Sequence, residues 1–185
     1  MIRAGGVVAY PTEHCYGLGC DPANRVAVRK LLRIKQRFIH KGLILIGDSM
    51  AQFRPYIWPL PAAMRAKLAQ SWPGRTTWLL PARPSHALIT GRHATIALRI
   101  PDHAGARKLC AMAGCAIVST SANRQHQPPA RTLAELKRMR LRGVDYILPG
   151  KTGGASEPSV IIDAKTGKVL RGNNHAVSAP DNHQR

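Results

Sequence analysis

The chain has 185 residues, of which 44% are hydrophobic. This content suffices for one buried core, and it excludes a collagen-like chain, a coiled coil and a disordered polymer. Lys and Arg number 28 against 9 Asp and Glu, which gives a formal net charge of +19. Such a charge attracts polyanions, of which RNA is the expected one, and predicts binding that weakens as salt is added. Part of the excess is also expected on solvated helix faces.

The apolar runs, such as residues 43–46, are far shorter than the roughly 20 residues that a membrane-spanning helix needs. The N-terminus has no apolar stretch that resembles a secretory signal. We therefore expect a cytoplasmic protein without membrane contact. Four cysteines form two C-x4-C pairs, at 15 and 20 and at 110 and 115. Structural zinc more often uses C-x2-C spacing, so we favour core cysteines over a metal site.

The hydrophobic pattern predicts alternating strands and helices. Strands are expected at 6–10, 43–46, 76–80, 95–100 and 116–120, with short strands near 146–148, 160–163 and 168–170. Residues 12–19 are expected to form a glycine-containing loop. Helices are expected after Asn24, Pro61 and Asp102, and a fourth begins at a capping box formed by Thr132 and Glu135. The pattern predicts one α/β domain over 1–172, closed by a hairpin at Thr166-Gly167, and a mobile polar tail over 173–185.

Two segments carry the clearest chemistry. Lys35-Gln36-Arg37 ends the first predicted helix, and Ser119-Thr120-Ser121-Ala122-Asn123 closes an apolar strand. Paired cations bind phosphate oxygens, and hydroxyls and amides hydrogen-bond to the same atoms. Together the segments predict a nucleotide site, provided that the fold brings them together. Alternatively, the cations only complement the helix dipole, an interaction of about 0.3–1 kcal/mol.

Seven motifs, in this order, resemble the YrdC/TsaC family. They are Tyr10-Pro11-Thr12-Glu13, Tyr16-Gly17-Leu18-Gly19, Lys35-Gln36-Arg37, 41–46, Trp72-Pro73-Gly74, 119–123 and Pro158-Ser159. The resemblance covers nearly everything through Gly172, and it is specific because chance matches do not preserve both order and spacing. It implies an open, twisted, mixed α/β sheet flanked by helices, with a basic concave surface. The family usually has a helix before the first strand, so a less covered sheet face is expected here.

The resemblance also implies a reaction. A threonylcarbamoyl-AMP synthase joins L-threonine, bicarbonate or CO2, and ATP into threonylcarbamoyl-AMP and pyrophosphate, for threonylcarbamoyladenosine modification of tRNA by a transferase partner. The threonine amine attacks CO2, and the resulting carbamate attacks the α-phosphorus. Because the substrates supply their own nucleophile, the protein's task is to position them and to neutralise charge.

Site residues follow from the matched motifs. Lys35 and Arg37 are the implied catalytic cations on the ATP phosphates. The other implied ATP-binding residues are Ser121, Asn123 and Arg171, and Thr77 is a further candidate that fits either ATP or threonine. The candidates for threonine are Thr12, Arg99, Ser119 and Ser159. Arg99 would pair with the substrate carboxylate. The hydroxyls of Thr12, Thr77 and Ser119 also fit simple strand-end or turn positions.

Magnesium is expected to accompany ATP, held mostly by phosphates and water because the acidic residues are few and scattered. Glu13 is the acid within a site motif, and the sequence leaves open whether it acts on the metal or orders the loop. A second hypothesis is an RNA-binding protein that recognises structured RNA or acts in ribosome maturation. Aromatic residues make up 5% of the chain, so base stacking is not its expected main mode of binding.

Overall fold

The computed structural model describes residues 1–84 and 86–172, so the predicted tail at 173–185 lies outside the described residues. Within them, nine strands form one sheet in the order β7-β1-β2-β6-β3-β5-β4-β8-β9. The strands are β1 Val8–Pro11, β2 Tyr16–Gly19, β3 Ile44–Ile46, β4 Thr76–Pro81, β5 Thr95–Arg99, β6 Ile117–Ser121, β7 Tyr146–Ile147, β8 Val160–Asp163 and β9 Val169–Arg171.

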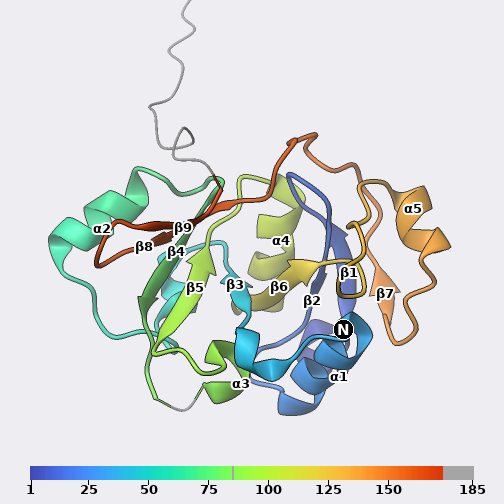
Figure 1. Cartoon of the computed structure of the whole chain (residues 1–185), viewed down its shortest axis with the longest axis horizontal. Coiled ribbons are helices and arrows are strands. Elements are labelled where there is room, and N and C mark those ends of the chain that lie inside the picture. The colour runs from blue at the N-terminus through green and yellow to red at the C-terminus, as the bar shows by residue number, and fades with distance from the viewer. Residues whose placement is uncertain (85, 173–185) are drawn as a thin grey trace, which may run out of the picture.

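Helices flank this sheet (Figure 1). They are α1 Arg25–Lys35, α2 Ala62–Ala69, α3 Ala87–Thr90, α4 Ala104–Ala113 and α5 Leu133–Arg138, with short 3-10 turns η1 Ile2–Ala4, η2 Ile39–Lys41 and η3 Met50–Phe53. In Figure 1, α2 lies near β8 and β9, and α5 lies near β7 at the opposite side of the molecule. None of the helices that the structure describes is long and apolar enough to cross a membrane.

The sheet mixes parallel and antiparallel pairs. β1 with β7, β3 with β5, and β4 with β8 are parallel, and the other neighbouring pairs are antiparallel. The predicted open mixed α/β sheet is confirmed. The predicted closing hairpin is also confirmed, because β8 and β9 pair antiparallel at one edge.

Buried residues form two clusters on the two faces of the sheet. Successive side chains of a strand point to opposite faces. Leu45 and Val118 accordingly belong to the larger cluster, which includes the apolar stripe of α1, whereas Ile46 and Ile117 belong to the smaller one. The smaller cluster also contains Cys110 of α4. The central strands are therefore covered on both faces, which gives the site a rigid base.

The segment before β1 is short. Ile2 of η1 is buried in the smaller cluster, whereas Met1 is 63% exposed. A cavity of about 650 Å³ lies beside it, and its lining includes Leu109, Met112 and Tyr146. This surface is the sheet face that was predicted to be less covered, and that expectation stays a prediction.

The prediction of a loop over residues 12–19 was wrong for its second half. Residues 16–19 form β2, which pairs with both β1 and β6. The glycines permit close packing here, because a Cβ on Gly19 would lie 2.7 Å from the carbonyl oxygen of Val118 and 2.9 Å from the Tyr10 ring. Glycine in a strand often marks such an approach of another backbone.

Helix boundaries agree with the predicted caps in two of three cases. Asn24 caps α1, accepting hydrogen bonds from the backbone of Val26 and Ala27, and Thr132 forms the capping box of α5 with Glu135. The prediction that Asp102 caps α4 was wrong. The N-cap is His103, whose side chain accepts from the backbone N–H of Ala106.

The close packing of Gly19 against Val118 and Tyr10 predicts that a larger residue at this position destabilises the protein. Gly19→Ala should lower the free energy of unfolding by about 1–3 kcal/mol, because the new Cβ must displace the backbone of β6 or the Tyr10 ring. Gly105→Ala is the control, since its Cβ would meet only the flexible His103 side chain, at 3.2 Å. Urea denaturation of both variants checks this, and equal stabilities would contradict it.

Candidate active site

Lys35 is a buried ammonium at the C-terminal end of α1. Its residue is 5% exposed. Its Nζ donates to Ser121 Oγ at 2.9 Å and to Asn123 Oδ1. Ser121 Oγ in turn donates to Asn123 Oδ1 at 2.8 Å. The helix end and the strand end on which the predicted nucleotide site depends therefore converge on one another.

The electrostatics around Lys35 favour an anion. Burial, followed by the nearby charge of Arg37, lowers the pKa of Lys35 to about 8. Its hydrogen-bond partners are neutral, so its charge has no carboxylate partner among the described residues. A bound anion would stabilise the ammonium and raise its pKa.

Arg37 lies beyond the helix rather than in its last turn, which corrects the prediction. Gln36 adopts a left-handed conformation, with φ of 53°, and ends α1. The Arg37 side chain then folds back, and its Nη2 donates to the carbonyl oxygen of Gly42 at 3.0 Å. Burial lowers the pKa of Arg37. Because of this turn, Lys35 and Arg37 approach from different parts of the chain backbone, yet both line the same cavity.

A cavity of about 380 Å³ brings most of the predicted site residues together. The predicted residues in its lining are Thr12, Lys35, Arg37, Arg99, Ser119, Ser121, Ser159 and Arg171. The rest of the lining, which was not predicted from the sequence to bind substrate, is His14, Cys15, Gly17, Leu43, Ile44, Thr120, Pro129 and Pro158. Four cations and several hydroxyls thus face one space, and no acidic side chain lines it among the described residues.

Thr77 and Asn123 lie behind this lining. Thr77 Oγ1 and Ser159 Oγ are hydrogen-bonded at 2.8 Å, and both residues are buried. Arg171 Nη2 donates to the same Ser159 Oγ at 3.0 Å and to the Ser159 carbonyl oxygen at 2.9 Å. Burial, then the charges of Arg99 and Arg37, lower the pKa of Arg171. Thr77 therefore acts on the cavity through Ser159.

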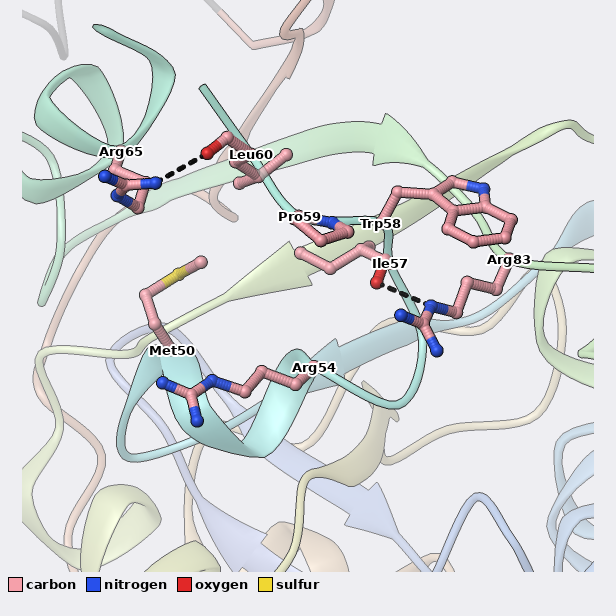
Figure 2. A pocket seen from close by; sticks show the side chains of 8 residues that line it. All are labelled: Met50, Arg54, Ile57, Trp58, Pro59, Leu60, Arg65 and Arg83. Atoms are coloured by element: carbon pink, nitrogen blue, oxygen red, sulfur yellow. Dashed lines mark hydrogen bonds between the residues drawn. The ribbon is translucent and has the colours of Figure 1, made fainter. Parts of the chain in front are cut away.

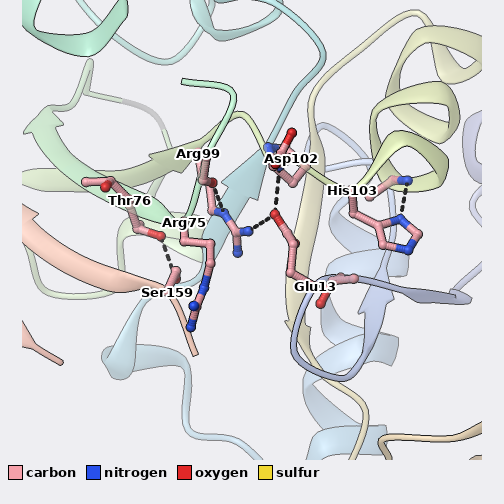
Figure 3. A network of polar contacts seen from close by, with 12 residues as sticks. Glu13, Arg75, Thr76, Arg99, Asp102, His103 and Ser159 are labelled. Carbon is pink, nitrogen blue, oxygen red and sulfur yellow. Dashed lines mark hydrogen bonds and ion pairs between the residues drawn. The ribbon is translucent and has the colours of Figure 1, made fainter. Parts of the chain in front are cut away.

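Arg99 ends β5 in a network of polar contacts (Figure 3). Its Nε donates to the carbonyl oxygen of Gly74 at 2.9 Å, and its Nη2 donates to Glu13 Oε1. Glu13 Oε1 also accepts from the backbone N–H of Asp102 at 2.7 Å. The guanidinium is thus held from two sides at the cavity wall.

Two of the predicted hydroxyls are held by neighbouring groups. Ser119 Oγ accepts from the Tyr10 hydroxyl at 2.7 Å, and Thr12 Oγ1 donates to the Cys15 carbonyl oxygen at 2.8 Å. Burial raises the pKa of Tyr10, so this phenol stays protonated and keeps donating. The role of Tyr10 was not predicted from the sequence, although its place in the first motif was a signal.

No group of three or more His, Cys, Asp or Glu side chains suitable for a metal occurs in the part of the chain that the structure describes. Glu13, the acid within the first site motif, binds Arg99 and the backbone N–H of Asp102. The described side chains therefore do not fit a metal site of their own.

Another cavity of about 380 Å³ shares no lining residue with the cavity that contains Lys35 and Arg37. Figure 2 shows its side chains, among them Trp58, which is 53% exposed. The Arg83 guanidinium lies 4.9 Å from the centroid of the Trp58 ring. Arg54 and Arg65 complete a basic and aromatic surface that the sequence alone did not single out.

Comparison with known proteins agrees with the motif pattern. The family model Sua5_yciO_yrdC, described as "Telomere recombination", matches residues 1–172. A protein of Nitrosococcus oceani named threonylcarbamoyl-AMP synthase is 48% identical over 172 residues, which cover 92% of this chain and 93% of that protein. A protein of Stenotrophomonas maltophilia with the same name is 48% identical over 173 residues, with the same two coverages.

Solved structures show the same fold. P. abyssi Sua5 complexed with L-threonine has a TM-score of 0.84 and 29% identity, and the match covers 92% of this chain but only 51% of that one. E. coli YciO has a TM-score of 0.78 and 26% identity, covering 92% and 84%. With a family model matched from the first residue to Gly172, the chain belongs to the Sua5/YciO/YrdC family.

Proposed function

We propose that this protein is a threonylcarbamoyl-AMP synthase, which joins L-threonine, bicarbonate or CO2, and ATP with release of pyrophosphate. The observation that carries the proposal is the cavity, in which Lys35, Arg37, Arg99 and Arg171 converge with serine hydroxyls. Its chemistry suits a triphosphate and a carboxylate bound side by side. The 48% identity to threonylcarbamoyl-AMP synthases over nearly the whole chain supports the same activity.

In the proposed mechanism, Lys35 and Arg37 bind the phosphates of ATP, and Arg171 binds from the side of β9. Ser121 and Asn123 hold the Lys35 ammonium, and Ser121, which lines the cavity, also contacts the nucleotide, whereas Asn123 acts from behind the lining. As the carbamate oxygen attacks the α-phosphorus, charge grows on the phosphoryl and leaving oxygens. Fixed cations stabilise that charge without reorganisation, which is where electrostatic catalysis is most effective.

The amino acid binds at the neighbouring part of the cavity. Arg99 pairs with the threonine carboxylate, and the hydroxyls of Thr12, Ser119 and Ser159 orient the rest of the substrate. The match to P. abyssi Sua5, whose structure is a complex with L-threonine, supports L-threonine as the amino acid but assigns no residue. Bicarbonate or CO2 then meets the threonine amine, and orientation rather than a protein nucleophile promotes the reaction.

Magnesium is proposed as a companion of ATP. Phosphate oxygens and water are its preferred ligands in ATP sites that lack a carboxylate cage. The chain's own contribution is to fix the phosphates through its cations. We further propose a cytoplasmic location, and the tRNA threonylcarbamoyl transferase machinery as the recipient of the product.

The first test measures pyrophosphate. Incubation of the protein with ATP, L-threonine and bicarbonate should release pyrophosphate, and omission of threonine should abolish the release. Mass spectrometry should detect threonylcarbamoyl-AMP in the complete reaction. Pyrophosphate release that is indifferent to threonine would contradict the proposed activity.

Lys35 predicts a pH dependence. Its pKa is lowered to about 8, so the ammonium that binds phosphate is lost as the pH rises through this value. The kcat/KM for ATP, which reports the free enzyme, should therefore fall above about pH 8. At saturating ATP the decline should move to higher pH, because bound phosphates favour the charged form.

Two variants check this assignment. Lys35→Met should reduce kcat/KM roughly hundredfold and remove the pH dependence, because a preorganised cation is lost. Lys35→Arg keeps the charge, so its alkaline decline should disappear even if its activity is low. An unchanged alkaline decline in both variants would assign the titration to another group.

A tRNA-binding role of the basic surface is a second proposal. The cavity lined by Trp58, Arg54, Arg65 and Arg83 supports it, since arginines contact phosphates and an exposed indole stacks on a base. This surface would hold tRNA near the transferase. RNA binding alone would leave the separate, acid-free nucleotide cavity without a role, so it is not the main function we propose.

Binding of tRNA should fall by a factor of roughly 10³ or more between 50 and 200 mM salt if about six or more phosphates are contacted. Trp58→Ala should weaken binding by about 1–3 kcal/mol through lost stacking. The variant should keep its threonine-dependent pyrophosphate release, since Trp58 lies outside the first cavity. Filter binding measures both effects. An affinity that does not change with salt concentration would contradict tRNA binding through this basic surface.

A further inference from the structure

Glu13 is a buried acid placed directly behind a cavity of cations. It follows Thr12 in the turn between β1 and β2 and is 8% exposed, yet it is not part of the cavity lining. Thr12 itself lines the cavity. Thr12 therefore faces the cavity, whereas the next residue, Glu13, lies behind the cavity wall.

Glu13 is an ion-pair partner of one site cation. Among the described residues, Arg99 pairs with Glu13, whereas Lys35, Arg37 and Arg171 have no carboxylate within ion-pair distance. These cations repel one another, as the effect of Arg99 on the pKa of Arg171 indicates. Removing one partner of a buried pair leaves an uncompensated charge, which is strongly unfavourable. Glu13 therefore offsets the repulsion that would otherwise turn Arg99 away.

The geometry of the pair leaves one edge of the guanidinium available. Nε of Arg99 is held by the Gly74 carbonyl. Its Nη2 is held by Glu13, as Figure 3 shows. Nη1 has no hydrogen-bond partner within residues 1–84 and 86–172. Arg99 lines the cavity, so its remaining N–H groups are the ones that a bound carboxylate can use.

The contacts of Glu13 are made through one carboxylate oxygen. Oε1 accepts both from Arg99 Nη2 and from the backbone N–H of Asp102, whereas Oε2 has no hydrogen-bond partner among the described residues. The carboxylate therefore ties the Arg99 guanidinium to the backbone at Asp102.

We propose that Glu13 is a positioning residue for amino-acid binding. It fixes the Arg99 guanidinium so that its free edge faces the substrate carboxylate, and it does not touch the substrate. This inference rests on the proposed function, because the carboxylate is that of L-threonine. It assigns Glu13 to Arg99 rather than to magnesium.

Glu13→Gln tests the proposal. Glutamine keeps the size of the side chain and an acceptor for the Asp102 N–H, but it removes the charge that holds Arg99. The KM for L-threonine should rise roughly tenfold or more, in line with loss of a charge-assisted contact. The KM for ATP should change less than twofold. Threoninol, which lacks the carboxylate, should bind to the variant and to the unmodified protein equally, by calorimetry.

Asp145→Asn is a control for the loss of a carboxylate, although its ion pair with Lys30 is more exposed than that of Glu13 with Arg99. Asp145 likewise accepts from one cation, Lys30 at 2.6 Å, and from one backbone N–H, that of Val7 at 2.7 Å. It does not line the cavity. The control should lose stability without any change in the KM for threonine. A Glu13→Gln variant that raises both KM values alike, or that matches the control, would overturn the proposal.

A readout that needs no turnover separates this inference from the proposed activity. The Arg99 Nε–H signal, assigned with Arg99→Lys, should be sharp and exchange slowly with water in the unmodified protein. It should broaden in Glu13→Gln and stay unchanged in Asp145→Asn. If the protein releases no threonine-dependent pyrophosphate, the proposed function fails while this signal still tests the positioning. An unchanged signal in Glu13→Gln refutes the positioning even in an active enzyme.

Discussion

A buried ammonium joins the two halves of the candidate site. Lys35 comes from the end of a helix, and its partners Ser121 and Asn123 come from the end of β6, 86 and 88 residues further along the chain. These neutral partners accept from two of the three N–H groups of the ammonium and do not balance its charge. The cavity therefore has an electrostatic preference for an anion before any ligand arrives. Arg37, Arg99 and Arg171 at the same cavity extend that preference.

Concentrated positive charge must be held in place by the fold. Arg37 is held by a backbone carbonyl, Arg171 by Ser159 and Arg99 by Glu13 and Gly74. Each guanidinium is thus oriented by fixed acceptors before the substrate binds. Such preorganisation is the condition under which cations lower the barrier of a phosphoryl or adenylyl transfer.

Gly17 and Gly19 of β2 allow the close backbone packing on which the cavity wall depends. With no side chains at Gly17 and Gly19, β2 lies close under the Tyr10 ring and against β6. Tyr10 can then reach Ser119 with its hydroxyl. The hairpin that results carries Thr12 to the cavity and Glu13 to Arg99. Backbone packing and site geometry are therefore linked at this hairpin.

Local signals in the sequence were sufficient for much of the fold. Apolar runs located eight of the nine strands, and Asn24 and the Thr132–Glu135 box located two helix starts, because periodicity and capping act over a few residues. β2 was missed because its glycines carry no strand signal. The motifs predicted that the segments carrying Lys35 and Ser121–Asn123 converge, whereas their direct hydrogen bonds were not predicted. The position of Arg37 depended on a left-handed residue at Gln36.

By itself, the sequence determined which groups are proposed to bind an anion, the order of the motifs and the excess of positive charge. Only the tertiary structure decided which groups share a cavity and which stand behind it. Glu13 and Arg99 are 86 residues apart, and no local pattern states that they meet. Their contact depends on the pairing of distant strands, since strand order and register are set by contacts across the whole sheet.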